Sequence, residues 1–204
     1  MLKKIVTLIC ALLLPFTATA ADIDKTQPYA MMTQVSEMAF ARLKAEQGII
    51  KKDPNHLKVI VEEELMPYVN HKYAALKLLG PNLKGANRAD VNEFIVAFRG
   101  YLIASYAQVL TQYTDQEIEF EPKKKLDSSK TITSVKVDIV DTPRPNIKLE
   151  FKLRQDKKTG EWQVFDMIAE GISLLSSKQS EWNGKLRQDG ILAVADDLER
   201  LAAQ

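Results

Sequence analysis

The stretch WQVFDMIAEGISLL at residues 162–175 places two carboxylates, Asp166 and Glu170, in an otherwise apolar segment. Such a pair could act as general acid and base, or as acid and nucleophile, in glycoside hydrolysis. In an extended strand, however, residues four apart lie about 13 Å from each other on one face, farther than either glycosidase geometry requires. We therefore expect no catalysis from this pair. A structural role, or a place at the rim of a binding cavity, is left open.

Other reactive side chains are sparse. The two histidines, His56 and His71, are fifteen positions apart and stand in no HExxH-like context, so we interpret both as solvated residues on helix surfaces. The chain has no P-loop, GxGxxG or GxSxG motif. The one cysteine, Cys10, lies inside the apolar N-terminal segment. We therefore expect no catalytic residue, no metal site and no cofactor.

The N-terminus has the pattern of a secretory signal peptide. Lys3 and Lys4 precede a short apolar segment, and Ala18 and Ala20 are small residues at the positions that a signal peptidase reads. The apolar segment is well short of the roughly 20 residues of a membrane-spanning helix. The sequence predicts a signal peptide at residues 1–20, cleavage before Ala21, and export to a periplasm.

The charge balance of the remaining chain, 21–204, is close to zero. Removing Lys3 and Lys4 from 28 Lys and Arg leaves 26, against 27 Asp and Glu. That balance provides no general attraction to nucleic acid, so we expect no nucleic-acid partner. The length suits one domain, and we predict a single domain at 21–204.

The first half of the chain has helical spacing, and we predict helices over 28–113. Met32, Val35, Ala39 and Leu43 repeat at intervals of three and four, which indicates one buried face.

Polar residues and prolines predict where these helices begin and end. Asp53 as N-cap with Pro54 at the first helical position predicts the start of a second helix. Pro67 should end or kink it, and Asn87 should cap a long helix over 88–113. That helix carries an aromatic stripe, which periodicity alone favours as an ordinary core face: Phe94, Phe98, Tyr101, Tyr106 and Tyr113.

The second half changes to a period of two. Apolar and polar residues alternate over 117–121, 135–139 and 147–154, and Asp156–Gly160 reads as a hairpin turn before a strand that begins at Trp162. These are at least four antiparallel strands with one apolar face, within a sheet over 117–175.

Helices are expected again at 177–203. Ser176 with Gln179 forms a plausible capping box for a helix that ends near Gly190, and a last helix should run from Ile191 to Ala203. Helices followed by a meander with one apolar face predict an α+β fold with the sheet packed against helices.

Several segments together resemble one family. The segment at 162–174, with the others in the same order, is similar to the MlaC family of periplasmic phospholipid-binding proteins, also called the toluene-tolerance family. The other segments are ELMPYV at 64–69, KYA at 72–74, EFIVAFRGYL at 93–102 with Tyr106, KQSEW at 178–182 and LRQDG at 186–190.

This resemblance implies a fold and a function. It implies an NTF2-like curved sheet cupped by helices, with an apolar cavity that holds the acyl chains of a glycerophospholipid. It also implies a non-enzymatic carrier that maintains outer-membrane lipid asymmetry by exchanging lipid with an outer-membrane lipoprotein–porin complex and an inner-membrane ABC transporter bearing an MCE-domain ring. On this interpretation Asp166 and Glu170 are structural, and Gly171 lets the backbone bulge or turn.

The apolar faces of the predicted helices and strands supply the expected lipid-binding residues: Val69, Tyr73, Leu76, Phe94, Phe98, Leu102, Tyr106, Val135, Val137, Leu149, Phe151, Val164, Ile168 and Ile172.

Two other functions compete with the lipid carrier. A periplasmic chaperone or adaptor could use the same scaffold, with the cavity filled by its own side chains. An enzyme on an NTF2-like scaffold is the third hypothesis, and the poverty in histidine and cysteine argues against it.

Overall fold

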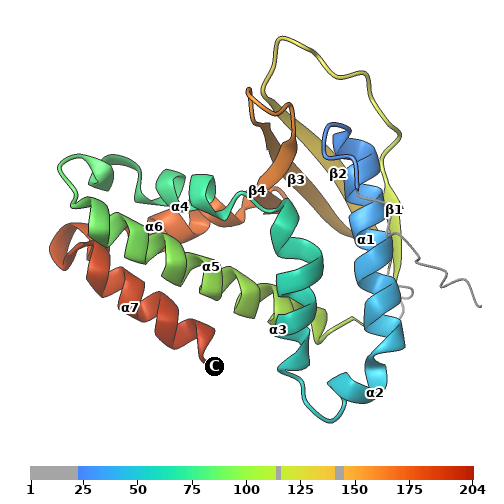
Figure 1. Ribbon diagram of the computed structural model, residues 1–204, viewed down its shortest axis with the longest axis horizontal. Helices are drawn as coiled ribbons and strands as arrows, with labels where there is room; N and C mark the ends of the chain where they lie inside the picture. Colours follow the sequence, from blue (N-terminus) through green and yellow to red (C-terminus); the bar gives the residue numbers. More distant parts are fainter. Residues whose placement is uncertain (1–22, 114–115, 141–144) are drawn as a thin grey trace, which may run out of the picture.

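The computed structural model describes residues 23–113, 116–140 and 145–204 (Figure 1). The predicted signal peptide, 1–20, lies outside these ranges, and the division into a signal peptide and one domain stays a prediction. The order of elements is helices, then a sheet, then two helices, so the predicted α+β fold is confirmed. Among the described residues no helix is long and apolar enough to cross a membrane.

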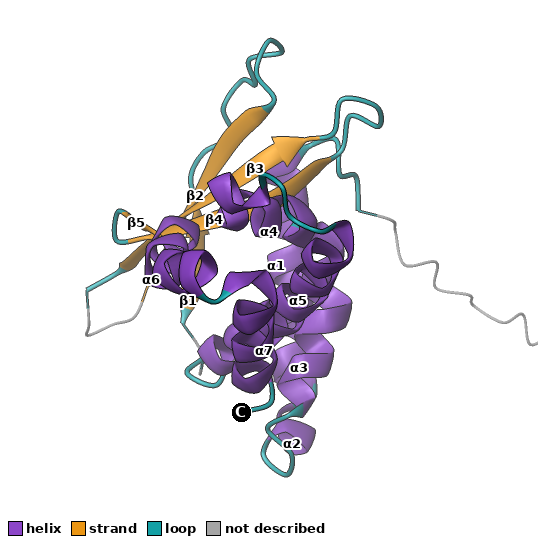
Figure 2. Ribbon diagram, turned by 90° about the vertical axis from the view of Figure 1, so that its left-hand side faces the viewer, coloured by secondary structure: helices purple, strands orange, loops and turns teal. Residues whose placement is uncertain are grey.

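The sheet is a five-stranded antiparallel meander in the order β1-β2-β3-β4-β5, which confirms the prediction of at least four strands. Figure 2 shows the strands as one layer, with most of the helices on one side of it. The strands are β1 (Glu117–Phe120), β2 (Ile132–Val140), β3 (Ile147–Gln155), β4 (Trp162–Ala169) and β5 (Ile172–Ser173).

Seven α-helices are present in the described part of the chain. In Figure 1 α5 runs beside α7 on the side of the molecule opposite to α1 and the outer strands. The helices are α1 (Pro28–Ala45), α2 (Gln47–Ile50), α3 (His56–Ile60), α4 (His71–Leu79), α5 (Arg88–Leu110), α6 (Leu174–Gln188) and α7 (Gly190–Ala202).

The expected cap of α5 is present, whereas the expected cap of α3 is not. The Asn87 side chain accepts a hydrogen bond from the Ala89 amide at 2.9 Å, which satisfies one free donor at the start of α5. Asp53 instead accepts from the Asn55 amide at 3.0 Å within a turn, and α3 begins only at His56. The prediction that Asp53 caps this helix is wrong, because its side chain stabilises the turn before it.

The segment after α3 changes its helical type before it ends. A π-helical turn covers Val61–Leu65 and a 3-10 turn covers Met66–Tyr68, which contains Pro67. Val69 then forms an isolated parallel bridge with Val164 of β4, and the Asn70 amide donates to the Val164 carbonyl at 2.7 Å. Pro67 therefore ends the helix as predicted, and the chain that follows is tied to the edge of the sheet.

The start of α6 also differs from the prediction. Ser173, not Ser176, is the N-cap, and its hydroxyl accepts from the Ser176 amide at 3.0 Å. Gln179 does not complete a capping box. Its amide donates to the carbonyls of Lys77 and Leu78 at 3.0 and 3.2 Å and so satisfies the C-terminal end of α4.

The apolar side chains form three clusters rather than one core. The first lies among α4, α5, α6 and α7 and includes Phe165 of β4. The second joins α1 to one face of the sheet, which we call the inner face and which carries Val135, Val137, Leu153 and Val164. The third joins the end of α1 to α3 and α5. Because α5 contributes to the first and third clusters, it connects the packing of α4, α6 and α7 to the packing of α1 and α3.

A β-bulge in β4 changes which of its side chains face inward. Leu153 of β3 pairs with Val164, and Lys152, the residue before Leu153, pairs with Asp166. Phe165 therefore has no partner in β3 and is the extra residue of the bulge. After the bulge Met167 joins Val164 on the inner face, opposite Phe151. Ile168 pairs with Glu150 and lies on the other face. The prediction that Val164 and Ile168 share one apolar face is therefore wrong.

Candidate functional site

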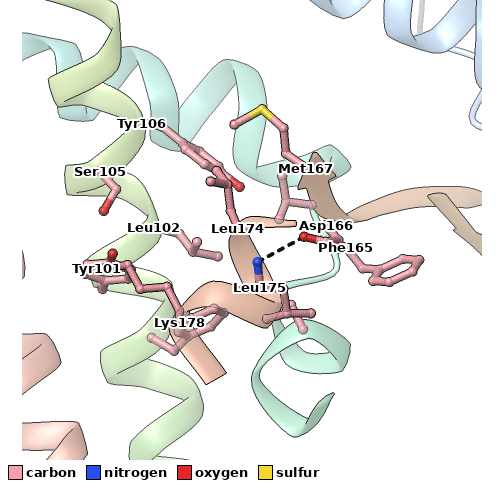
Figure 3. Close-up of a pocket in the computed structure, with 13 residues that line it drawn as sticks. Tyr101, Leu102, Ser105, Tyr106, Phe165, Asp166, Met167, Leu174, Leu175 and Lys178 are labelled. Atoms are coloured by element: carbon pink, nitrogen blue, oxygen red, sulfur yellow. Dashed lines mark hydrogen bonds between the residues drawn. The ribbon is translucent and has the colours of Figure 1, made fainter. Parts of the chain in front are cut away.

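An apolar pocket lies where α5, the start of α6 and the second half of β4 meet (Figure 3). Its volume is about 110 Å³. The lining residues are Val69, Ala74, Phe98, Tyr101, Leu102, Ser105, Tyr106, Phe165, Asp166, Met167, Leu174, Leu175 and Lys178.

Local backbone structure explains how the lining residues from each element come to face the pocket. Leu102 and Tyr106 are four residues apart on α5, so they lie one turn apart on the same side of the helix. Val69 is held there by its bridge to β4. Met167 reaches the inner face only because the bulge shifts the alternation of β4.

The apolar surface of the pocket continues along the sheet. Met167 pairs with Phe151, which pairs with Val135, and paired residues of an antiparallel sheet carry their side chains on one face about 5 Å apart. Leu149, Phe151 and Met167 are only half-buried. A pocket of 110 Å³ is smaller than the roughly 300–1,000 Å³ of small-molecule sites, so a larger ligand would extend onto this inner face.

Asp166 organises the start of α6. Its carboxylate accepts from the Ser173 hydroxyl at 2.8 Å and from the Leu175 amide at 3.1 Å. The second of these bonds is drawn in Figure 3. Both oxygens therefore hold the junction between β5 and α6 against β4.

Glu170 forms the tight turn between β4 and β5. Glu170 has a backbone φ of +49°, in the left-handed region that residues other than glycine rarely adopt, and Gly171 follows with a φ of +82°. The Glu170 carboxylate accepts from the Lys148 amide at 2.6 Å, which ties the turn to β3. The two carboxylates thus do not share one extended strand, and each bonds to backbone groups, in agreement with their structural interpretation.

Replacing Asp166 by alanine (Asp166→Ala) should lower the free energy of unfolding by about 0.5–2 kcal/mol, as for the loss of an N-cap residue. Asp166→Asn should lower it less, because the amide oxygen can still accept from the Leu175 amide. Ligand binding should stay within a few-fold of wild type for both variants. Urea denaturation and ligand titration check this, and a collapse of binding at unchanged stability would contradict the structural role.

The pocket wall is largely uncharged. Burial raises the pKa of the Tyr106 phenol to about 12, and the nearby charge of Asp166 adds to the rise. Tyr106 is therefore neutral at physiological pH and offers a hydroxyl group, not a phenolate, to a ligand.

The predicted lipid-binding residues fall in different places, and their role in binding stays a prediction. Four of them line the pocket: Val69, Phe98, Leu102 and Tyr106. Five lie on the inner face of the sheet: Val135, Val137, Leu149, Phe151 and Val164. Phe94 is buried among the helices, and Tyr73 packs against the same cluster with its ring edge-on to Phe165.

The other three are less enclosed. Leu76 is half-buried on α4, and Ile168 is half-buried on the face of the sheet away from Val164. Ile172 continues the inner-face row through Ala169 and Leu149, but it is 62% exposed.

The sequence pattern did not predict several of the lining residues. Met167 was hidden by the bulge, because strict alternation places it on the polar side. Leu174, Leu175 and Lys178 follow the strand and belong to α6, whose start was predicted three residues too late. Tyr101 was visible as one ring of the aromatic stripe, which is the signal that could have found it.

Histidine contributes nothing to this pocket. His56 pairs with Glu46 through its Nε2 at 2.5 Å and is half-buried, so its interpretation as a solvated residue is wrong. Burial lowers the pKa of His71. Within the described ranges no group of three or more His, Cys, Asp or Glu side chains could hold a metal ion.

The antiparallel sheet with helices on its inner face and an apolar pocket between them defines an NTF2-like α+β protein. A solved structure of similar fold, the phospholipid-binding protein from Ralstonia solanacearum in complex with a phospholipid, gives a TM-score of 0.74 over 86% of this chain and 97% of that chain, at 16% identity. The chain is 36% identical over 204 residues to the intermembrane phospholipid transport system binding protein MlaC of Haemophilus influenzae, covering 100% of this chain and 95% of that one. The family model for the MlaC protein matches residues 33–200. The chain belongs to the MlaC family.

Proposed function

We propose that this protein is a periplasmic phospholipid carrier without enzymatic activity. It holds the acyl chains of a glycerophospholipid in the pocket and along the inner face of the sheet, and it carries lipid between the outer and inner membranes. The observation that supports this most is the continuity of the apolar pocket with the half-buried inner face, in a chain of the MlaC family.

The energetics of the ligand suit such a site. Each methylene removed from water contributes about 0.8 kcal/mol, so two acyl chains with roughly thirty methylenes contribute about 24 kcal/mol relative to water. A bilayer already shields these methylenes, so transfer from membrane to pocket is close to neutral. Binding therefore depends on a dry apolar surface, and the direction of transport depends on the partners.

The partners follow from the family. The carrier exchanges lipid with an inner-membrane ABC transporter that bears an MCE-domain ring and with an outer-membrane lipoprotein–porin complex. This exchange maintains the lipid asymmetry of the outer membrane. The name of the Haemophilus influenzae relative, which places that protein in an intermembrane phospholipid transport system, supports this role.

The protein should purify with bound glycerophospholipid. Organic extraction after a mild, detergent-free purification, followed by mass spectrometry, should yield about one lipid per protein molecule, because a stripped apolar surface would face water. Lipid-free protein would contradict the proposal and favour the chaperone or adaptor whose cavity is filled by its own side chains.

A further inference from the structure

One cation lies in the wall of the apolar pocket. Lys178 of α6 is the single lysine or arginine among the thirteen lining residues, and the pocket contains one acidic residue, Asp166. Both oxygens of Asp166 already accept hydrogen bonds, from Ser173 and from Leu175. Because a carboxylate repels an anion, the ammonium of Lys178 is the charged group among these thirteen residues that can bind an anionic ligand.

Lys178 is positioned at the boundary between pocket and solvent. Its ammonium lies 5.9 Å from the centre of the Tyr101 ring and 5.4 Å from that of Trp182. Its side chain is 36% exposed. Two aromatic rings thus support the aliphatic stem and attract the charge, while the ammonium remains within reach of water. Figure 3 shows Lys178 beside Tyr101 on the α5 side of the pocket.

The existing partner of Lys178 leaves the ammonium available. Glu181 accepts from it at 2.7 Å, and the Glu181 side chain is 52% exposed. This hydrogen bond raises the pKa of Lys178, so the ammonium is charged at neutral pH. An exposed ion pair contributes little free energy, and an ammonium has three donors, so a second anion can share Lys178 with Glu181.

A phospholipid in this pocket needs a partner for its phosphate. The acyl chains occupy the apolar wall, and the phosphodiester at their end carries a negative charge that is costly to hold near apolar atoms without a counter-charge. We propose that Lys178 anchors the phosphate of the bound lipid, with the acyl chains running from there along Leu102, Tyr106 and Met167. This proposal rests on the proposed function.

The test removes the charge on the protein and the phosphate on the ligand in turn. Wild type and Lys178→Met are incubated with vesicles that contain equal amounts of phosphatidylglycerol and diacylglycerol with the same acyl chains. The protein is then reisolated and its lipid is analysed by mass spectrometry. Wild type should prefer the phospholipid, and Lys178→Met should reduce that preference by about 3- to 10-fold, as for one partly exposed charge-assisted hydrogen bond.

Lys185→Met is the matched control. Lys185 lies on the same helix and pairs with Asp197 of α7, outside the pocket, and Asp197 keeps Arg200 as a partner when Lys185 is removed. This variant loses the same charge and should keep the wild-type preference. Inorganic phosphate at matched ionic strength should not abolish the preference.

The outcomes separate this proposal from the function on which it rests. If wild type takes up neither lipid, the carrier function fails. If wild type takes up lipid but Lys178→Met keeps its preference, or Lys185→Met loses it equally, the phosphate anchor fails while the carrier function stands. Abolition by inorganic phosphate would indicate a general anion site and would also overturn the anchor.

Discussion

Replacing Leu102 by glutamate (Leu102→Glu) should give a folded protein that purifies with about ten-fold less lipid than wild type, or less still. Leu102 is half-buried and lines the pocket, so the new carboxylate would lie where acyl chains are proposed to lie. Burial of an unpaired charge beneath a lipid costs several kcal/mol, and 1.4 kcal/mol already corresponds to a factor of ten. Without lipid, water can enter the pocket and solvate the charge, so the fold should survive.

Val96→Glu is the control for this variant. Val96 lies on the same helix but is 68% exposed, so the same charge is added away from the pocket. It should keep wild-type lipid content. Lipid mass spectrometry and circular dichroism check both proteins. If the Leu102→Glu protein were folded and carried as much lipid as wild type, the lipid would have to bind elsewhere, and the proposal for this pocket would be wrong.

Two nearby positions are poor probes. Phe98 lines the pocket but is only 3% exposed and packs within the helical cluster, so a charge there should unfold the protein before it reports on lipid. Ile172 is too exposed for a charge to be costly. The half-buried wall at Leu102 separates binding from folding better than either.

Replacing Phe94 by alanine (Phe94→Ala) should lower the free energy of unfolding by about 3–5 kcal/mol, the usual cost of removing a buried ring. Phe94 is fully buried and stacks on Phe98 with ring centroids 6.1 Å apart, in the cluster that holds α5 against α4, α6 and α7. That loss is a large share of the 5–15 kcal/mol of a typical domain. The melting temperature should fall by about 6–20 °C.

Urea denaturation of delipidated protein measures this change, because bound lipid stabilises the native state by mass action and would obscure it. Val96→Ala on the same helix should change the stability by less than about 0.5 kcal/mol. If Phe94→Ala were as stable as Val96→Ala, the helical cluster could not be the core that holds α5 in place.

Local patterns decided much of this fold. The alternation in 117–121, 135–139 and 147–154 predicted three strands that pair as expected, because a strand with one apolar face can bury it in only one register. Asn87 predicted the start of α5, since a side-chain cap bonds to the amides next to it in the chain. The same locality explains why Phe98, Leu102 and Tyr106, which follow one another at intervals of four residues on α5, were predicted to lie on one side of that helix.

What the sequence determined by itself is the order of helices and strands, the apolar faces of β2 and β3, and the family to which the chain belongs. Only the tertiary structure decided which faces meet. The bulge at Phe165, set by pairing with β3, exchanged Ile168 for Met167 on the inner face. The contact of β4 with α6 gave Asp166 its hydrogen bonds to Ser173 and Leu175. These outcomes depend on partners far away in the chain, and no periodicity within one segment encodes such a partner.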